Sequence, residues 1–387
     1  MYREDMSSIS NYRHGRLTRT GVLLVNLGTP DAATPAAVRK FLAEFLSDPR
    51  VIEAPRWLWL PLLHGAILQI RPRLSAAAYR QIWTDAGSPL LVNSKNIAAA
   101  LAQSLQARLH GPLAVPLAHA SATPTIPVVL GMTYGNPSIA AALQILQSAQ
   151  AERILVLPLF PQYSATSTAS VFDRVTMELR RWRWVPELRF VNHYYDEPAY
   201  VEALARRIAA HWEFKAARSF LLFSFHGIPK SYVMAGDPYY CQSLNTARRV
   251  AERLQLTANE WSVGFQSRVG RAEWIGPYTE EVLRQRAADG LHDVAVICPG
   301  FATDCLETLE EIAIRYRDSF LDAGGASYSY IPALNSDPDH IELLTEVVER
   351  HIQGWPLART ENQSENPAED AARQQVLQRA LSKGALR

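Results

Sequence analysis

The sequence predicts an α/β protein of two similar Rossmann-like domains, each a four-stranded parallel sheet flanked by helices, with a cleft between them. Two observations predict this class. Short apolar runs of strand length alternate with longer helical segments, which is the pattern of a parallel sheet. The eight runs also fall into two sets of four along 387 residues, a length that suits two domains.

We expect the first domain over residues 21–197, preceded by an N-terminal arm of residues 1–20. Apolar runs bounded by turn residues predict its strands, at residues 21–27, 127–132, 153–160 and 188–194. Thr34 followed by Pro35 is typical of an N-cap and a first helical position, so a helix is expected to begin there. Helical segments continue to about residue 109, with a break at residues 87–89, and recur at 138–150 and 168–181.

We expect the second domain over residues 198–336, beginning with a helix at 198–213. Its four strands are predicted at residues 219–225, 261–265, 293–299 and 328–332. The helices between them are expected at residues 241–254, 278–288 and 306–321. A last helix within residues 337–353 is expected to pack back on the first domain. Residues 354–387 are polar and predict a mobile tail with a short helix.

Composition limits the classes of function. Hydrophobic residues make up 48% of the chain and charged residues 20%, as in soluble globular proteins. Because 39 basic residues nearly balance 38 acidic ones, no broad positive field is available to bind nucleic acid. The three cysteines, Cys241, Cys298 and Cys305, form no CxxC motif. They predict free thiols, the latter two buried, in a reducing cytoplasm.

The most lipid-like window runs from Trp57 to Leu68. It is too short to span a bilayer, which takes about 20 apolar residues. Arg56, Arg71 and Arg73 flank it. The window is therefore either a core helix or an amphipathic element at an interface or a pocket mouth. The N-terminal arm carries arginines but no apolar stretch, so it does not have the pattern of a secretory signal.

His226 stands where the predicted strand 219–225 meets Gly227 and Pro229. That position is the carboxyl end of a strand, where open parallel sheets bind their ligands. On position alone, a single histidine there is more often a structural residue than a catalytic one. The GxGxxG, GxxxxGK[ST], GxSxG and HExxH patterns do not occur, which gives little support to a nucleotide-dependent enzyme or a serine hydrolase.

An acidic segment follows the strand expected at 293–299. Residues 306, 309, 313, 316 and 320 form an apolar stripe with helical spacing. Asp304 could cap this helix, and Glu311 could be a solvated partner of Arg315. Glu307, in the first turn, would face the strand ends. A carboxylate and a neutral imidazole together can bind Fe(II) or transfer protons.

Six blocks occur in order along the chain: residues 25–30 (VNLGTP), 87–89 (GSP), 157–164 (LPLFPQYS), 224–229 (SFHGIP), 264–268 (GFQSR) and 298–307 (CPGFATDCLE). With these blocks, over about residues 21–352, the chain resembles the ferrochelatases, which insert ferrous iron into a porphyrin to make haem. The resemblance implies a chelatase-like fold and a lyase that converts protoporphyrin IX to protohaem. It leaves coproporphyrin III open as the physiological substrate.

The resemblance also implies roles for residues. His226 and Glu307 correspond to the family's metal and proton-transfer pair, with His226 accepting a pyrrole proton. Asp304 and Glu311 correspond to a relay of protons or metal along the helix. The residues implied for the porphyrin pocket are Leu27, Ser88, Tyr134, Gln266 and Trp274. The window from Trp57 to Leu68 corresponds to a lip over the pocket mouth, with loose peripheral contact at the inner face of the membrane.

Departures from the family pattern limit what the resemblance implies. Cys305 stands where many members have histidine, and Arg315 where some have an acidic residue, so the relay would be shorter. Because no cysteine follows residue 352, we expect no iron–sulfur cluster and no resident cofactor, with Fe(II) as a substrate. Two alternatives stay open: a cobalt chelatase of the sirohydrochlorin type, and a non-catalytic tetrapyrrole-binding protein. The sequence does not give the oligomeric state.

Overall fold

The computed structural model describes residues 19–110, 126–215, 218–270, 272–355 and 367–384. The first of its two sheets contains β1 (Arg19–Thr29), β2 (Val128–Gly135), β3 (Ala151–Pro158) and β4 (Glu187–Phe190). The second contains β5 (Phe220–His226), β6 (Trp261–Gln266), β7 (Asp293–Ile297) and β8 (Ser327–Ile331).

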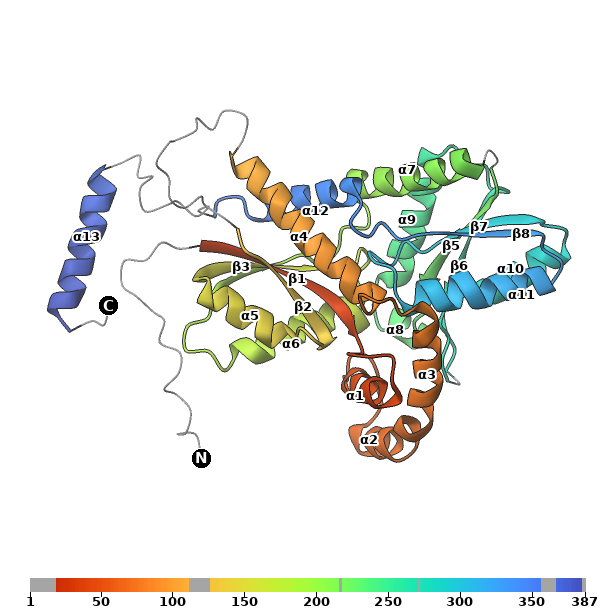
Figure 1. Cartoon of the computed structure of the whole chain (residues 1–387), viewed down its shortest axis with the longest axis horizontal. Coiled ribbons are helices and arrows are strands. Elements are labelled where there is room, and N and C mark those ends of the chain that lie inside the picture. The colour runs from red at the N-terminus through yellow and green to blue at the C-terminus, as the bar shows by residue number, and fades with distance from the viewer. Residues whose placement is uncertain (1–18, 111–125, 216–217, 271, 356–366, 385–387) are drawn as a thin grey trace.

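All pairings within the two sheets are parallel. The strand order is β2-β1-β3-β4 in the first sheet and β6-β5-β7-β8 in the second, so both sheets have the same topology. Their central strands are fully buried, as at Val22–Val25 and Leu221–Phe223. The predicted class, two similar α/β domains with four-stranded parallel sheets, is confirmed (Figure 1).

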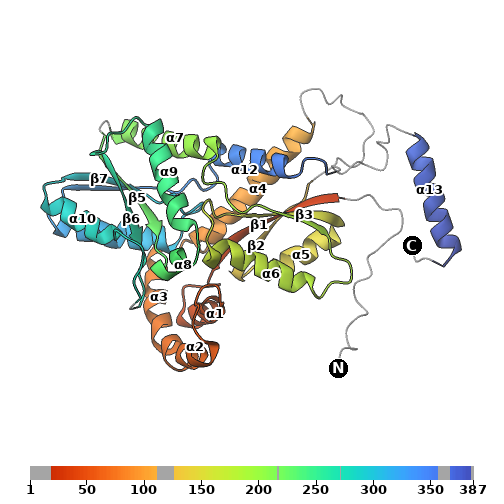
Figure 2. The same ribbon diagram turned by 180° about the vertical axis from the view of Figure 1, so that it is seen from behind.

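Helices cover both sheets (Figures 1 and 2). The elements associated with the first sheet are α1 (Pro35–Leu46), α2 (Arg56–Leu62), the π-helix η1 (Leu63–Ile67), α3 (Leu68–Ile82), α4 (Pro89–His110), α5 (Ile139–Ser148), the π-helix η2 (Ala165–Ala169) and α6 (Ser170–Leu179). Residues of α5 and α6 share a buried cluster with β1 and β3. Thr34 caps α1 through the amide of Ala37, and Pro35 is its first residue, as predicted.

The second half of the chain contains α7 (Pro198–Lys215), α8 (Lys230–Met234), α9 (Tyr239–Arg253), α10 (Thr279–Ala288), the π-helix η3 (Glu307–Tyr316), α11 (Arg317–Asp322), α12 (Pro338–His351) and α13 (Pro367–Ser382). Elements α10, η3 and α11 share a buried cluster with β5 and β7. Another cluster joins α4, α7, α9 and α12 to strands of both sheets, so the apolar core is continuous between the two halves.

Three strands end at least two residues earlier than the sequence predicts, and the first is β3, which ends at Pro158 rather than residue 160. β4 ends at Phe190 rather than residue 194, because the amide of Tyr194 bonds to the carbonyl of Pro161 and not to β3. β7 ends at Ile297 rather than residue 299. Pro299 has no amide hydrogen to donate to a neighbouring strand, which explains this earlier end.

His340 is a fully buried histidine in the first turn of α12. Its Nδ1 lies 2.6 Å from the carbonyl oxygen of Asn335, and its Nε2 has no hydrogen-bond partner among the described residues. Burial lowers the pKa of His340 from 6.5 to about 4. The folded protein therefore keeps this ring neutral at pH values at which the unfolded chain would protonate it.

We predict that His340 makes the protein less stable in mild acid. The unfolded chain binds a proton near pH 6.5 and the folded one only near pH 4, so stability is complete above 6.5 and falls as pH decreases through this window. Through this one group, the free energy of unfolding changes by at most about 1.4 kcal/mol per pH unit. Urea unfolding of wild type and His340→Gln between pH 4.5 and 8 measures this dependence. Relative to its value at pH 8, the free energy of unfolding should fall less with decreasing pH in the variant than in wild type. Equal slopes would contradict this assignment.

Candidate active site

His226 is the last residue of β5, and it lies opposite Gln266 of β6. Its Nδ1 is 2.6 Å from the carbonyl oxygen of Gly227. Because that oxygen can only accept a hydrogen bond, Nδ1 carries the proton of the neutral ring and Nε2 carries the lone pair. The half-buried ring lies between Trp274 and Phe301, with centroids 6.5 and 6.4 Å away. His226 can therefore act as a base through Nε2, in largely aromatic surroundings.

Gly227 allows the chain to pass close to β6 and Trp274. Its amide donates to the carbonyl of Gln266 at 2.8 Å. A Cβ atom at this position would stand 2.9 Å from that carbonyl oxygen and 3.1 Å from the Trp274 ring. Pro229 also forms a bridge with Trp274. Any side chain at residue 227 would therefore disturb the contact between the loop carrying Trp274 and the end of β5.

Glu307 is the first residue of η3, a ten-residue π-helix where the sequence predicts an α-helix. The wider winding changes which side chains face the core, so the predicted apolar stripe is only partly right. Tyr316 and Phe320 are buried, but Leu306 and Leu309 are half-buried and pack against α1–α3. π-Helices are rare and often occur at functional sites.

Gln266 connects Glu307 to the strand end that carries His226. Its Nε2 donates to the backbone carbonyl of Glu307 at 3.0 Å, and its Oε1 accepts from Ser224 at 2.7 Å. The side chain is 1% exposed, so these bonds are protected from water. His226 and the start of η3 are thus held at the same edge of the second sheet.

Asp304 is a buried carboxylate with several hydrogen-bond donors. Oδ1 accepts from Thr308, from the Tyr330 hydroxyl at 2.5 Å and from the amide of Ala333, while Oδ2 accepts from Asn335 at 2.7 Å. These bonds join the start of η3 to the segment after β8. Asp304 therefore anchors the π-helix, and its part in a relay stays a prediction.

Glu311 is also buried, which makes the solvated alternative wrong. It accepts hydrogen bonds from the amide and hydroxyl of Ser267, and from Tyr316 at 2.7 Å. The expected ion pair with Arg315 is present at 3.4 Å. Ser267 has a positive φ of 67°, so Glu311 stabilises an unfavourable turn directly after β6. Its part in a relay, like that of Asp304, stays a prediction.

Cys298 and Cys305 are buried free thiols, as predicted, and Cys241 is exposed. Burial and the charge of Glu307 raise the pKa of Cys305 well above its usual value. Burial, with smaller effects of Asp304 and Glu311, does the same for Cys298. Both therefore remain protonated thiols at neutral pH.

α3, which carries Arg71 and Tyr79, packs against η3, although no sequence pattern predicted these two residues as site residues. Burial lowers the pKa of Arg71, and the charge of Glu307 opposes this effect. Burial and then the charge of Glu307 raise the pKa of Tyr79. Arg71 was visible in the sequence only as a flank of the apolar window.

The implied pocket residues come from both halves of the chain. Ser88 lies 2.8 Å from the hydroxyl of Thr29, and both are buried. Leu27 is half-buried among residues of α1–α3. Tyr134 is fully buried, and its hydroxyl donates to Asp48 at 2.9 Å. The ring of Tyr134 therefore belongs to a buried cluster with residues of α1, η1 and α3.

Trp274 is half-buried and donates to the carbonyl of Val269 at 2.9 Å. A cavity of about 320 Å³ adjoins it, lined by Lys230, Val233, Met234, Tyr240, Glu273, Trp274, Ile275 and Gly276. Neither His226 nor Glu307 lines this cavity. The porphyrin cleft and the five pocket residues therefore stay predictions.

The apolar window forms α2, η1 and the start of α3. No residue of α2 is buried, and Trp57, Leu58 and Leu62 are 74%, 53% and 52% exposed. A core helix is therefore wrong for α2, although Leu63 and Leu68 anchor the following turns in a buried cluster. Among the residues that the structure covers, no helix combines the length and apolarity needed to cross a membrane.

A family model described as "Ferrochelatase" matches residues 19–352. This chain belongs to the ferrochelatase family. It is 50% identical over 381 residues to the ferrochelatase of Thioalkalivibrio sulfidiphilus, covering 97% of this chain and 98% of that one. It is 51% identical to the ferrochelatase of Nitrosococcus oceani, with 98% and 99% covered. Among solved structures, SirB from Bacillus subtilis with Fe3+ covers 89% of this chain and 98% of its own, at 14% identity and a TM-score of 0.49.

We predict that Gly227→Ala destabilises the protein, because the new Cβ would contact the Gln266 carbonyl and Trp274 too closely. The expected loss in free energy of unfolding is about 1–3 kcal/mol. Gly65→Ala is the matched control, since a Cβ there meets nothing within 4 Å. It should raise stability by about 0.5 kcal/mol. Thermal unfolding measures both, and a Gly227→Ala variant as stable as wild type would contradict the geometry.

Proposed function

We propose that this chain inserts ferrous iron into protoporphyrin IX to form protohaem, with His226 and Glu307 as the metal and proton-transfer pair. Membership of the ferrochelatase family carries the proposal. The placement of His226 at the carboxyl end of β5 supports it, because parallel sheets bind small molecules at that edge. Of the two porphyrins left open by the sequence, protoporphyrin IX is the one proposed.

The chemistry of metallation matches these groups. Two pyrrole N–H protons leave the macrocycle as Fe(II) enters, so the reaction requires a base and releases two protons. Nε2 of His226 carries a lone pair that can accept a pyrrole proton. Fe(II) must also lose water and then leave the protein for the ring. One imidazole and one carboxylate are suitable ligands for a brief stay, whereas a closed four-ligand cage would retain the metal.

Asp304 and Glu311 are proposed to assist along η3, on the route by which protons or metal reach or leave Glu307. Leu27, Ser88, Tyr134, Gln266 and Trp274 are proposed to surround the porphyrin, directly or through their neighbours. Arg71 and Tyr79 extend this set from α3, since α3 packs against η3, the element that carries Glu307. No resident cofactor and no iron–sulfur cluster are proposed.

The lip, defined as the window from Trp57 to Leu68 in α2, η1 and the start of α3, is proposed as a loose peripheral membrane contact at the inner face. Trp57, Leu58 and Leu62 expose large apolar side chains, and so do Ile70 and Leu74 of α3. Several large apolar side chains exposed on neighbouring helices favour an interface, and a porphyrin is itself apolar. The proposed location is therefore cytoplasmic and peripheral to the membrane.

The two alternatives receive less support. A cobalt chelatase of the sirohydrochlorin type would use paired histidines, whereas the residue two before Glu307 is Cys305. A non-catalytic binding protein would bind porphyrin and metal without joining them. Turnover on Fe(II) and Co(II) with both macrocycles distinguishes these alternatives from the proposed enzyme.

We predict that His226→Ala and Glu307→Gln each lower kcat/KM at least about 100-fold, because each removes a proton-transfer or metal-binding group. The measurement is the Fe(II)-dependent loss of free-porphyrin fluorescence under anaerobic conditions, run with protoporphyrin IX and coproporphyrin III side by side. His193→Ala is the control, since His193 follows β4 and is 43% exposed. Near-native turnover of His226→Ala would refute the proposed chemistry.

We predict that replacing Trp57 and Leu58 together by serine weakens binding to anionic phospholipid vesicles about tenfold, because two exposed apolar side chains are lost. Co-sedimentation with vesicles measures the effect. Phe214→Ser is the matched control, since Phe214 of α7 is 91% exposed but lies outside the lip. Equal binding of wild type and the double variant would argue against the lip as a membrane contact.

A further inference from the structure

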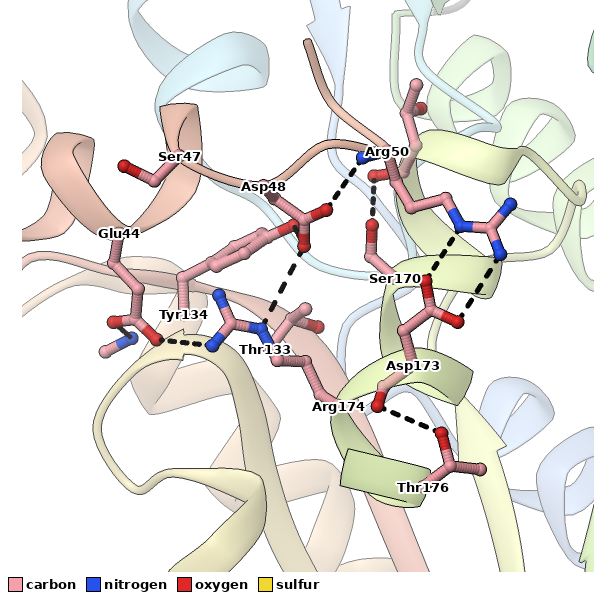
Figure 3. Close-up of polar contacts among 12 residues, drawn as sticks. Glu44, Ser47, Asp48, Arg50, Thr133, Tyr134, Ser170, Asp173, Arg174 and Thr176 are labelled. Atoms are coloured by element: carbon pink, nitrogen blue, oxygen red, sulfur yellow. Dashed lines mark hydrogen bonds and ion pairs between the residues drawn. The ribbon is translucent and has the colours of Figure 1, made fainter. Parts of the chain in front are cut away.

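The α1–α2 junction, residues 47–55, connects α1 to the lip. Its central residue is Asp48, whose side chain is 6% exposed. Oδ1 of Asp48 accepts from the amide of Arg50 at 2.8 Å, and Oδ2 accepts from the hydroxyl of Tyr134 at 2.9 Å. The guanidinium of Arg174 lies 3.9 Å from Oδ2. Figure 3 shows Asp48 between these groups, on the loop that leaves α1.

The bond to Tyr134 ties the junction to the first sheet. Tyr134 lies at the end of β2, and its ring packs edge-on against Phe45 of α1 at 5.1 Å. Burial and the charge of Asp48 raise the pKa of Tyr134 well above its usual value. Its hydroxyl therefore stays protonated and remains a donor to Asp48 at any working pH.

Neighbouring ion pairs surround this bond but lie closer to solvent. Arg50 pairs with Asp173 of α6 at 2.8 Å, and Arg174 lies 3.6 Å from Glu44 (Figure 3). Exposed pairs of this kind contribute little, since water and salt screen them. A buried carboxylate that loses its donor, by contrast, is left unsatisfied at a substantial cost. Asp48 is thus the member of this network on which the junction depends most.

The junction is also held from the second domain. The hydroxyl of Tyr232, in α8, donates to the carbonyl of Val51 at 3.2 Å and lies 3.3 Å from the amide of Glu53. α8 follows β5 and His226 directly in the chain. The residues that lead into the lip are therefore tied both to the first sheet and to the segment after His226.

The helices after the junction extend to the proposed reaction centre. The indole of Trp59 in α2 donates back to the carbonyl of Leu46 at 2.7 Å, which holds α2 against the end of α1. α3 then packs against η3, the element that carries Glu307. A shift of the junction would move α2 and α3, whereas His226 and Glu307 themselves stand on β5 and η3.

We propose that Asp48 is a positioning residue for the porphyrin: its bond to Tyr134 fixes the junction and so sets the lip and α3 over the macrocycle. This inference rests on the proposed function. In this proposal the lip and α3 bind the porphyrin without transferring its protons or its metal, so loosening them removes binding that is equal in ground and transition states. Such a loss raises KM for porphyrin and leaves kcat unchanged.

Asp48→Asn and Tyr134→Phe test the inference, because each removes the charged hydrogen bond and retains the volume of its side chain. Each variant should raise KM for porphyrin about five- to tenfold. kcat and KM for Fe(II) should remain those of wild type. The double variant should be no worse than either single one, since both changes break the same bond. Asp318→Asn, in an exposed ion pair with Arg317, is the control and should change nothing.

An unchanged porphyrin KM in both variants, additive effects in the double variant, or an equal loss of kcat would overturn the positioning role. Tyr134→Phe keeps the buried ring and decides the question by itself if Asp48→Asn does not fold. Failure of the wild type to insert iron would instead overturn the proposed function. Quenching of protein fluorescence by porphyrin then still measures whether Asp48→Asn and Tyr134→Phe weaken binding.

Discussion

The side chain of Gln266 holds the two parts of the proposed reaction centre together. One end accepts from Ser224 of β5, two residues before His226, and the other donates to the backbone of Glu307. Its backbone carbonyl also accepts from Gly227. A glutamine suits this place because its amide is both donor and acceptor and carries no charge to desolvate. The alignment of β5, β6 and η3 depends on these buried bonds.

Because of its π-helical winding, η3 contacts a second part of the molecule in addition to the second sheet. With more residues per turn than an α-helix, η3 buries Glu311 towards Ser267 and leaves Leu306 and Leu309 to pack against the helices of the lip. The helix that carries Glu307 therefore contacts both the loop after β6 and α1–α3. Asp304 fixes its first turn by bonds to Tyr330 and Asn335. η3 is therefore the element that both the lip and the strand ends of the second sheet contact.

The sequence predicted the features that depend on regular patterns. Apolar runs located all eight strands, and His226 stands at the carboxyl end of β5, as its place in the sequence predicted, while its role came only from the family resemblance. The π-helix escaped prediction because an apolar stripe spaced for an α-helix still contains Tyr316 and Phe320, which are buried either way. Arg71 lies within α3 and Asp48 in the loop after α1, and a single polar residue gives no periodic signal at either place. The role proposed for Asp48 depends on its tertiary contact with Tyr134.

Cys305 shows how one departure from the family pattern limits the chemistry. Its thiol is buried, and burial together with the charge of Glu307 raises its pKa. Before iron arrives, this position therefore carries no charge and adds only volume beside the first turn of η3. A histidine there could share a proton with Glu307, whereas a neutral thiol is a poor base. The proton and metal roles proposed for this chain therefore rest on His226 and Glu307, with no base at residue 305 between Asp304 and Glu307.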